Sequence, residues 1–162
     1  QNIMSKVLRN TLLAVTTAGG LALAPLATSH LNDKEIQQSY RQSFFTLVAL
    51  NFGPMASTAK GEMPYDQARM EGWANDLAAL TELNVMRGFA DGSDKGTTRA
   101  KPEIWKNKAD FESKLGDFKS AAAKLQQVVA SGDEKAVAAQ VGATGKACKA
   151  CHDEYKSKNY LY

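Results

Sequence analysis

The sequence has few of the residues that bind metals or form covalent scaffolds, with only two cysteines and two histidines among 162 residues. A scaffold of several disulfide bridges is therefore excluded, and a four-ligand zinc site would require all four of these residues. The net charge of +3 is too small to indicate a nucleic-acid-binding surface. Twelve glycines, four prolines and 44% hydrophobic residues are typical of a globular protein, and the length corresponds to one domain.

Long apolar runs are equally scarce, because the chain has only one, at residues 11–26. Basic residues precede this run and small residues follow it, which is the order found in a secretory signal peptide. The run is short for a membrane span, which needs about 20 apolar residues; an uncleaved membrane anchor is the alternative. We therefore expect residues 1–29 to be a signal peptide with an extension before Met4, and residues 30–162 to form one periplasmic domain.

Removal of the signal peptide changes the net charge of the chain and the histidines available as metal ligands. The exported chain is nearly neutral, and His30 lies at or beside its new N-terminus, where no fixed ligand geometry is expected. His152 is then the one histidine inside the folded domain. Export also places both cysteines in an oxidising compartment.

The exported chain shows the periodicity of amphipathic helices, without a convincing alternating strand. The first helix is expected to start with a capping box at Asn32 and to kink or end at Gly53–Pro54. Pro64 suits the start of a second helix, which is expected to end near Asn84. The apolar stripes of the four segments are Ile36, Tyr40, Phe44, Leu47 and Val48; Met70, Trp73, Leu77 and Leu80; Phe111, Leu115, Phe118, Ala122, Leu125 and Val129; and Val137, Val141, Thr144, Cys148 and Tyr155.

The second half of the chain completes the predicted architecture. Residues 85–100 form a long polar loop, of a kind that is often functional. Pro102 is expected to start the third helix, and Ser131–Glu134 to form a capping box before the fourth. Four helices with mostly short connections predict an all-α fold, an antiparallel four-helix bundle. Three helices plus an irregular segment is the alternative.

A Cys-x-x-Cys-His motif stands at Cys148–His152, and this is the attachment signature of c-type haem. At about 100° per residue along a helix, Cys151 lies about 60° short of a full turn from Cys148, and His152 about 40° beyond it. All three side chains therefore project from one side of the helix. We expect one haem c per chain, joined to Cys148 and Cys151 through thioethers, with His152 as the metal ligand.

Other uses of these residues explain the motif less well. A zinc site lacks ligands, because only two cysteines and one histidine lie near each other in the sequence. A thioredoxin-type redox pair is usually accompanied by a βαβ pattern, which is absent from the sequence. A structural disulfide between residues three apart on a helix is unusual, and it leaves His152 unexplained.

A second strong iron ligand is hard to find. Six-coordinate electron carriers usually place Met or His at the sixth position, and no second histidine is available in the folded domain. The methionines of the exported chain, Met55, Met63, Met70 and Met86, are more simply interpreted as apolar filler. An iron with an open or weakly occupied sixth position is therefore favoured, and such an iron permits small ligands to bind.

Further stretches match a known family of haem proteins. They are Tyr40–Ser43, Asn51–Met55, Lys60–Gly61, Pro64–Asp66, Pro102–Trp105 and Cys148–Tyr155. With the haem motif near the C-terminus, the chain from about residue 31 onward resembles the cytochromes c′, the class II c-type cytochromes, which are helix bundles. Residues 85–100 are hard to match to that family.

The resemblance implies roles for four further residues. Phe45 occupies the position over the distal haem face, where the family commonly has Leu or Met; it cannot ligate iron, and it should hinder distal ligands. Arg41 and Gln42 match residues near the haem propionates. Lys156 matches a basic residue on the proximal side. From the residues alone, Phe45 is equally an ordinary core residue, Arg41 a solvated surface charge, and Lys156 a cap of the helix C-terminus.

These observations favour an exported haem protein with five-coordinate, high-spin iron that binds NO and CO. The resemblance to the cytochromes c′ implies a role in NO binding or protection. A periplasmic electron-transfer cytochrome is the alternative. An enzymatic role such as a peroxidase has little support, because no second histidine or acid–base pair marks a distal catalytic site. The resemblance also implies a homodimer through the first two helices. The electron-transfer alternative implies a redox partner protein.

Overall fold

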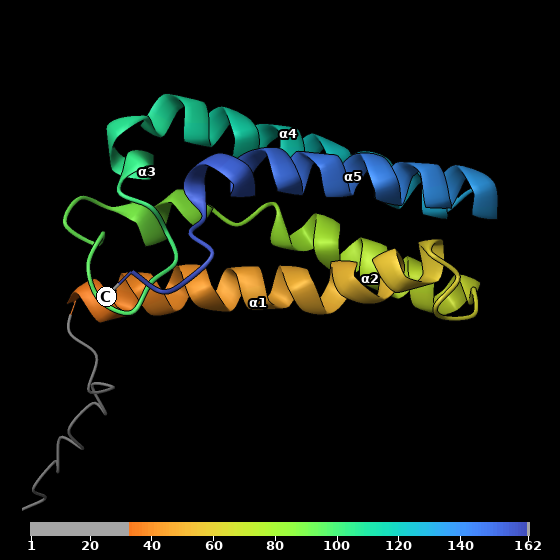
Figure 1. Cartoon of the computed structure of the whole chain (residues 1–162). Coiled ribbons are helices and arrows are strands. Elements are labelled where there is room, and N and C mark those ends of the chain that lie inside the picture. The colour runs from red at the N-terminus through yellow and green to blue at the C-terminus, as the bar shows by residue number, and fades with distance from the viewer. Residues whose placement is uncertain (1–32, 162) are drawn as a thin grey trace, which may run out of the picture. The chain divides into compact units, whose positions relative to one another are not determined.

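The computed structural model describes residues 33–161, which form an all-α bundle (Figure 1). Its helices are α1 (Asp33–Ala59), α2 (Gln67–Leu80), the 3₁₀ helix η2 (Val85–Phe89), α3 (Glu103–Lys106), α4 (Lys108–Val129) and α5 (Glu134–Tyr155). The long helices α1, α2, α4 and α5 run in alternating directions, which confirms the antiparallel four-helix bundle. The predicted signal peptide, His30 and the capping Asn32 lie outside the described residues. No helix within the described part of the chain is long and apolar enough to cross a membrane.

The core follows the predicted stripes most closely in α4 and α5. On α4 every predicted stripe residue is buried except Leu115, which is half-buried and packs against the core. On α5, Val137, Val141, Thr144 and Tyr155 are buried. Because burial of an apolar side chain contributes about 1.5–3 kcal/mol, these two facing stripes hold the helix that carries the haem motif against α4.

The first helix departs from its prediction in two ways. It continues through Pro54 and ends at Ala59, so of the two expectations for Gly53–Pro54, a kink or an end, the end is wrong. Proline removes one backbone hydrogen bond, and the adjacent Met55, which is completely buried, anchors this part of the helix in the core. The predicted stripe is also only partly right, because Ile36 and Leu47 are 49% and 45% exposed.

The other helix boundaries are set by caps that differ from those expected. Asp66 caps α2 by accepting a hydrogen bond from the backbone N–H of Arg69 at 2.9 Å, so α2 starts after Pro64 rather than at it. It ends at Leu80, short of the predicted Asn84. The helix expected from Pro102 is interrupted at Asn107, whose φ of −125° and ψ of 48° separate α3 from α4.

The turn before α5 uses a different capping residue from the predicted one. The carboxylate of Asp133, not the hydroxyl of Ser131, accepts hydrogen bonds from the backbone N–H groups of Lys135 and Ala136, both at 3.0 Å. Gly132 precedes it with a φ of +72°, in the left-handed region that favours glycine. This turn fixes where α5 begins, and therefore where its C-terminal motif lies along the bundle.

Candidate functional site

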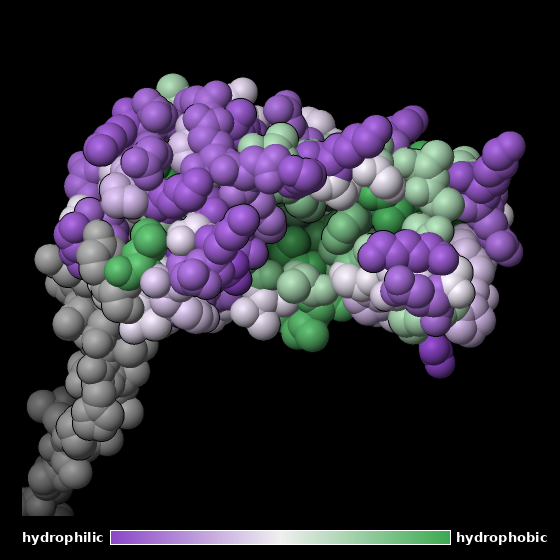
Figure 2. All heavy atoms as spheres, in the orientation of Figure 1, coloured by the Kyte–Doolittle hydropathy of each residue, from purple (hydrophilic) through white to green (hydrophobic). Residues whose placement is uncertain are grey.

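The haem motif lies in the last two turns of α5. Cys148 and Cys151 are half-buried and pack against the hydrophobic core, while His152 is exposed. The helix is continuous from Glu134 to Tyr155, so the angular relation expected between the three side chains holds. Figure 2 shows an apolar band over the middle of the bundle, between α1 and α5, with hydrophilic surface on either side. The two cysteines thus lie on the side of α5 that packs against the core, and His152 lies outside that contact.

Both cysteines are free thiols that keep their protons at neutral pH. Burial raises the pKa of Cys148, and burial also raises the pKa of Cys151 to about 11. No disulfide joins the two residues in this structure. Addition of a thiol across a vinyl group gives a thioether, so both residues have the chemistry that covalent haem attachment uses.

His152 is held in its neutral form. Partial desolvation of its ring is the main cause that lowers its pKa, and the positive charges of Lys156 and Arg99 lower the pKa further. Asp153 acts in the opposite direction. Neutral imidazole has a free nitrogen lone pair, which is the form that binds iron. The electrostatic surroundings thus favour the protonation state that the predicted role of His152 requires.

Arg41 lies inside the bundle, where its side chain is 3% exposed. Its guanidinium donates hydrogen bonds to the carbonyl oxygen of Gly88 at 2.8 Å, to the hydroxyl of Ser93 at 3.2 Å and to the hydroxyl of Thr98 at 3.3 Å. The alternative interpretation of Arg41 as a solvated surface charge is therefore wrong. Instead it ties α1 to the segment that follows η2.

Two aromatic rings and one distant carboxylate complete the surroundings of Arg41. Its guanidinium carbon lies 5.3 Å from the ring centre of Phe89 and 5.5 Å from that of Trp105, within cation–π range. Burial lowers the pKa of Arg41 and the charge of Asp94 partly offsets this, but an arginine side chain stays protonated. The site thus contains a buried positive charge whose direct hydrogen-bond partners are all neutral.

Gln42 and Phe45 follow Arg41 on α1 and differ in their burial. Gln42 is exposed, and its amide donates a hydrogen bond to the carbonyl oxygen of Thr97 at 2.9 Å. Phe45 is half-buried and packs against the core, with its ring 5.0 Å from that of Phe44 in an edge-on arrangement. An apolar ring at this position offers no atom that binds iron.

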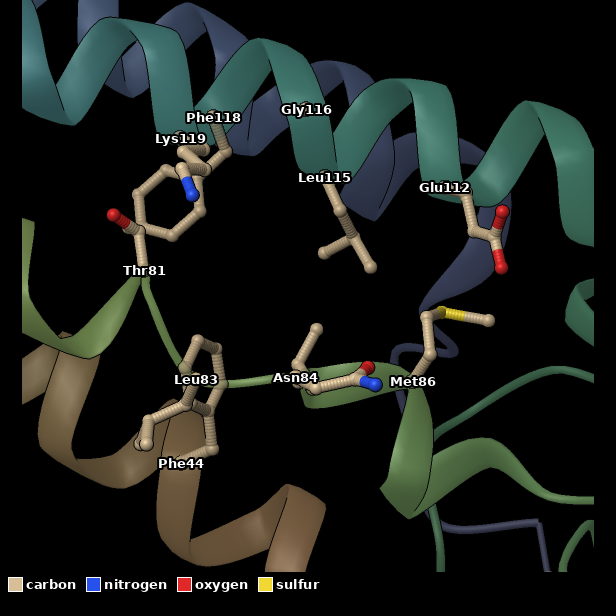
Figure 3. Close-up of a pocket in the computed structure, with 11 residues that line it drawn as sticks. Phe44, Thr81, Leu83, Asn84, Met86, Glu112, Leu115, Gly116, Phe118 and Lys119 are labelled. Carbon is tan, nitrogen blue, oxygen red and sulfur yellow. The ribbon is translucent and has the colours of Figure 1, made fainter.

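An open pocket of about 160 Å³ lies between α4 and the segment that joins α2 to η2. Residues of α1, α4 and η2 line it, among them Phe44, Leu115 and Met86 (Figure 3). Its lining is mainly apolar, and Phe44 also contacts Phe45. No residue of α5 lines this pocket, so it is separate from the haem motif.

The end of α5 is fixed by Tyr155 and Lys156, which follow His152. Lys156 is the residue at which the helix ends, and its backbone N–H donates to the carbonyl oxygen of His152 at 3.1 Å. Its side chain is exposed. Tyr155 is buried and its hydroxyl donates to the carboxylate of Asp110 on α4 at 2.5 Å. Lys114 bridges Asp110 and Glu154 at 3.5 and 3.6 Å, which joins the same two helices.

We expect the hydrogen bond between Tyr155 and Asp110 to give the fold a measurable acid dependence. The bond from Tyr155, followed by the charge of Lys114, lowers the pKa of Asp110. A carboxylate with a lowered folded-state pKa contributes stability above its ordinary pKa of about 3.9, and this contribution is lost as the pH falls through the folded value.

Tyr155→Phe should therefore be less stable than the wild type at pH 6, and the difference should shrink at pH 3 and below. Urea unfolding midpoints at the two pH values measure this. Asp117→Asn, a change at an exposed carboxylate on the same helix, is the control. An equal destabilisation by Tyr155→Phe at both pH values would show that Asp110 does not depend on this bond.

Sequence reasoning missed the residues that hold the loop and the end of α5. They are Gln38, Ser93, Lys101 and Asp110, and each acts through contacts with residues at least 45 positions away. No local pattern marks such partners. Thr97, Thr98 and Arg99, from the loop that is hard to match, prove to be attachment points between α1 and the C-terminal residues.

The donor set fits a c-type haem. Two free thiols and a neutral imidazole project from one helix beside an apolar surface, and a buried guanidinium stands on the neighbouring helix. In the described part of the chain, no three His, Cys, Asp or Glu side chains gather as they would around a metal ion held by protein atoms alone. A prosthetic group that carries its own iron needs only the imidazole, and the thiols supply its covalent attachment.

Comparisons with known proteins decide the family. The profile of the family described as Cytochrome C' matches residues 37–156. The chain belongs to the cytochrome c′ family. Its relatives include cytochrome c' of Cereibacter sphaeroides, 39% identical over 158 residues, which cover 96% of this chain and 99% of the relative. Cytochrome c' of Rubrivivax gelatinosus is 41% identical over 122 residues, covering 74% of this chain and 92% of the relative.

Solved structures of the cytochrome c′ family have the same fold. Cytochrome c prime from Shewanella frigidimarina aligns with a TM-score of 0.74 and 41% identity, over 79% of this chain and 99% of its own. A nitric oxide complex of a mutant cytochrome c prime from Alcaligenes xylosoxidans aligns with a TM-score of 0.71 and 36% identity, over 80% and 99% of the two chains. The resemblance seen in the sequence motifs is thus confirmed along the whole bundle.

Proposed function

We propose that this chain is a gas-binding haem c protein with five-coordinate, high-spin iron, and that it serves in NO binding or protection. Cys148 and Cys151 hold the haem, and His152 is the one axial ligand from the protein. When bound, the haem supplies an iron atom with a free coordination position for NO, or for CO when reduced. The residues of the chain attach it, provide one ligand and limit access to the other face.

The observation that carries this proposal is the contrast between His152 and Phe45. His152 is the only histidine among the described residues, and the family resemblance implies that Phe45, which packs against the core, occupies the distal position. Met55 and Met70 are fully buried in the core, which supports their interpretation as packing residues. The nitric oxide complex of a relative from Alcaligenes xylosoxidans supports NO as the ligand.

Arg41 and Gln42 are proposed to serve the acidic edge of the haem. The buried guanidinium of Arg41 has only neutral hydrogen-bond partners, and a charge-assisted bond to a propionate would compensate its charge. Gln42 lies one residue further along α1. Lys156 is proposed to contribute positive charge on the proximal side, where it already lowers the pKa of His152.

A CO titration of the reduced, haem-loaded protein tests the gas-binding function. We expect one CO per haem and a complete change of the haem absorption spectrum at saturation. A reduced protein whose spectrum is unchanged under saturating CO would overturn the proposal. Loss of bound haem during the titration is checked by absorption after gel filtration.

A periplasmic electron carrier is the second candidate, because haem iron cycles between two oxidation states whether or not it binds a gas. Rapid reduction by a physiological partner that is unaffected by Phe45→Ala would support this role over gas binding. We propose a gas-binding or electron-transfer protein rather than an enzyme.

We further propose that the protein is a periplasmic homodimer formed through α1 and α2. Leu47 and Leu50 lie about one turn apart on α1 and are 45% and 64% exposed, so they form a neighbouring apolar pair on this helix, which supports an interface there.

In a two-fold dimer each substitution occurs twice. We therefore expect Leu50→Glu to weaken dimerisation by about 100-fold or more, because burial of each leucine contributes about 1.5–3 kcal/mol. Light scattering of the holoprotein at micromolar concentration measures this. Leu161→Glu, which changes an exposed leucine outside α1 and α2, is the control. A wild-type protein that is monomeric under these conditions would contradict the dimer.

A further inference from the structure

The last turn of α5, which carries His152, ends against a single residue, Lys101. A helix leaves its last four carbonyl groups without partners inside the helix, and here these belong to residues 152–155. The carbonyl oxygen of His152 accepts from the backbone N–H of Lys156. The other three accept from Lys101. Its ammonium lies 3.3 Å from the carbonyl oxygen of Asp153 and 2.9 Å from that of Glu154. Its backbone nitrogen lies 3.0 Å from the carbonyl oxygen of Tyr155.

Lys101 is therefore both a hydrogen-bonding cap and a charge placed at the negative end of the helix. A cation near the last turn interacts favourably with the partial negative charge of the terminal carbonyls. From the sequence, Lys156 is expected either to be a basic residue on the proximal side of the haem or to cap the C-terminus of this helix. In the structure Lys156 supplies only its backbone N–H, and the ammonium that reaches the carbonyls of residues 153 and 154 comes from Lys101, 52 and 53 positions earlier.

The segment that carries Lys101 is fastened to the chain on both sides of the cap. Toward the C-terminus, Arg99 donates from its guanidinium to the carbonyl oxygens of Ser157 and Lys158 at 2.9 and 2.7 Å. The backbone N–H of Ser157 donates back to the carbonyl oxygen of Arg99 at 2.7 Å. An isolated β-bridge pairs Ala100 with Lys156. Lys101 is thus held in place by its neighbours and does not depend on its own side chain for position.

Toward the N-terminus, the same segment is fastened to α1. The amides of Gln38 and Gln42 both donate to the carbonyl oxygen of Thr97, and Arg41 donates to the hydroxyl of Thr98. Residues 97–101 therefore form a continuous hydrogen-bonded connection from the helix that carries Phe45 to the turn that carries His152. The two residues proposed to face the two sides of the iron lie on the helices that this connection joins.

We propose that Lys101 is a positioning residue for His152. By bonding the terminal carbonyls of α5, it fixes the helical turn on which the imidazole sits, and so it sets how the imidazole is directed at the iron. This inference rests on the proposed function, in which His152 ligates haem iron. Lys101 acts through the backbone carbonyls of residues 153–155 and is a positioning residue, not a ligand.

Lys101→Met in the haem-loaded protein tests this role, because methionine preserves the length and removes the ammonium. We expect the iron–histidine stretching band of the reduced protein, measured by resonance Raman spectroscopy, to shift and broaden. The amides of residues 152–156 should exchange with deuterium about tenfold faster, as the loss of hydrogen bonds from a charged donor implies. Lys101→Arg, which keeps the charge and the donors, should restore both signals.

Lys124→Met is the matched control, since it removes the same charge from an exposed position on α4 and should leave the band unchanged. A wild-type band and wild-type exchange in Lys101→Met would overturn the positioning role while leaving the proposed function intact. A wild-type protein without any iron–histidine band would overturn the proposed function and this inference together. If Lys101→Met does not fold, Lys101→Gln, which keeps one donor, should show intermediate effects on both signals.

Discussion

Replacing both cysteines, as in the double variant Cys148→Ser/Cys151→Ser, is expected to abolish covalent haem attachment completely. Thioether bonds form only from thiols, and a serine hydroxyl at the same position does not add to a haem vinyl group. The two residues are half-buried and pack against the core. They are the only two cysteines of the sequence, so no other cysteine substitutes for them. Each single variant should keep one covalent bond and retain its haem less firmly.

Acid–acetone extraction, followed by haem staining of a denaturing gel, measures covalent attachment directly. The wild type should keep its haem on the protein band, and the double variant should lose all of it. Ala150→Ser introduces the same hydroxyl between the two cysteines and leaves both thiols in place, so it should stain like the wild type. Haem that stays on the double variant after extraction would contradict attachment through Cys148 and Cys151.

Phe45→Ala is expected to accelerate CO binding to the reduced protein by about 10–100-fold. Fitting a ligand against a bulky, packed ring costs about 1–3 kcal/mol of strain, and each 1.4 kcal/mol corresponds to a factor of ten in rate. Phe45 is restrained by its edge-on contact with Phe44, 5.0 Å away, so it does not move aside freely. Removal of the ring therefore lowers the barrier at the distal face.

Flash photolysis of the CO complex measures this rate. Phe45→Leu should lie between the wild type and Phe45→Ala, and it also provides a smaller loss of core packing if the alanine variant is unstable. Phe52→Ala, which removes a half-buried ring two turns further along α1, is the matched control and should change the rate little. Equal CO association rates in the wild type and Phe45→Ala would show that the ring does not control access to the iron.

The residues that could be predicted from the sequence are those whose role depends on local spacing. The haem motif needs only the helical period that separates Cys148, Cys151 and His152, and the stripes of α4 and α5 need the same period over a longer stretch. The order of the four long helices followed from these stripes. Proline and capping signals were less informative, because tertiary packing around Met55 carries α1 through Pro54.

The residues that could not be predicted depend on contacts between distant parts of the chain. Arg41 is buried because η2 and the following loop close over it, and a Cβ atom at Gly88 would lie 2.8 Å from the Cβ of Arg41. Lys101 caps α5 because residues 97–101 run beside the C-terminus. Neither relation leaves a periodic signal, since each involves a single side chain in an irregular loop.

The coordination of the iron in the absence of added ligand is the most direct test of this account. Absorption and electron paramagnetic resonance spectra of the purified, oxidised and reduced protein report the spin state and the number of axial ligands. One axial histidine and an apolar ring at the distal position predict high-spin, five-coordinate iron in both oxidation states. A low-spin, six-coordinate spectrum without added ligand would contradict the account, because it would require a second protein ligand to the iron.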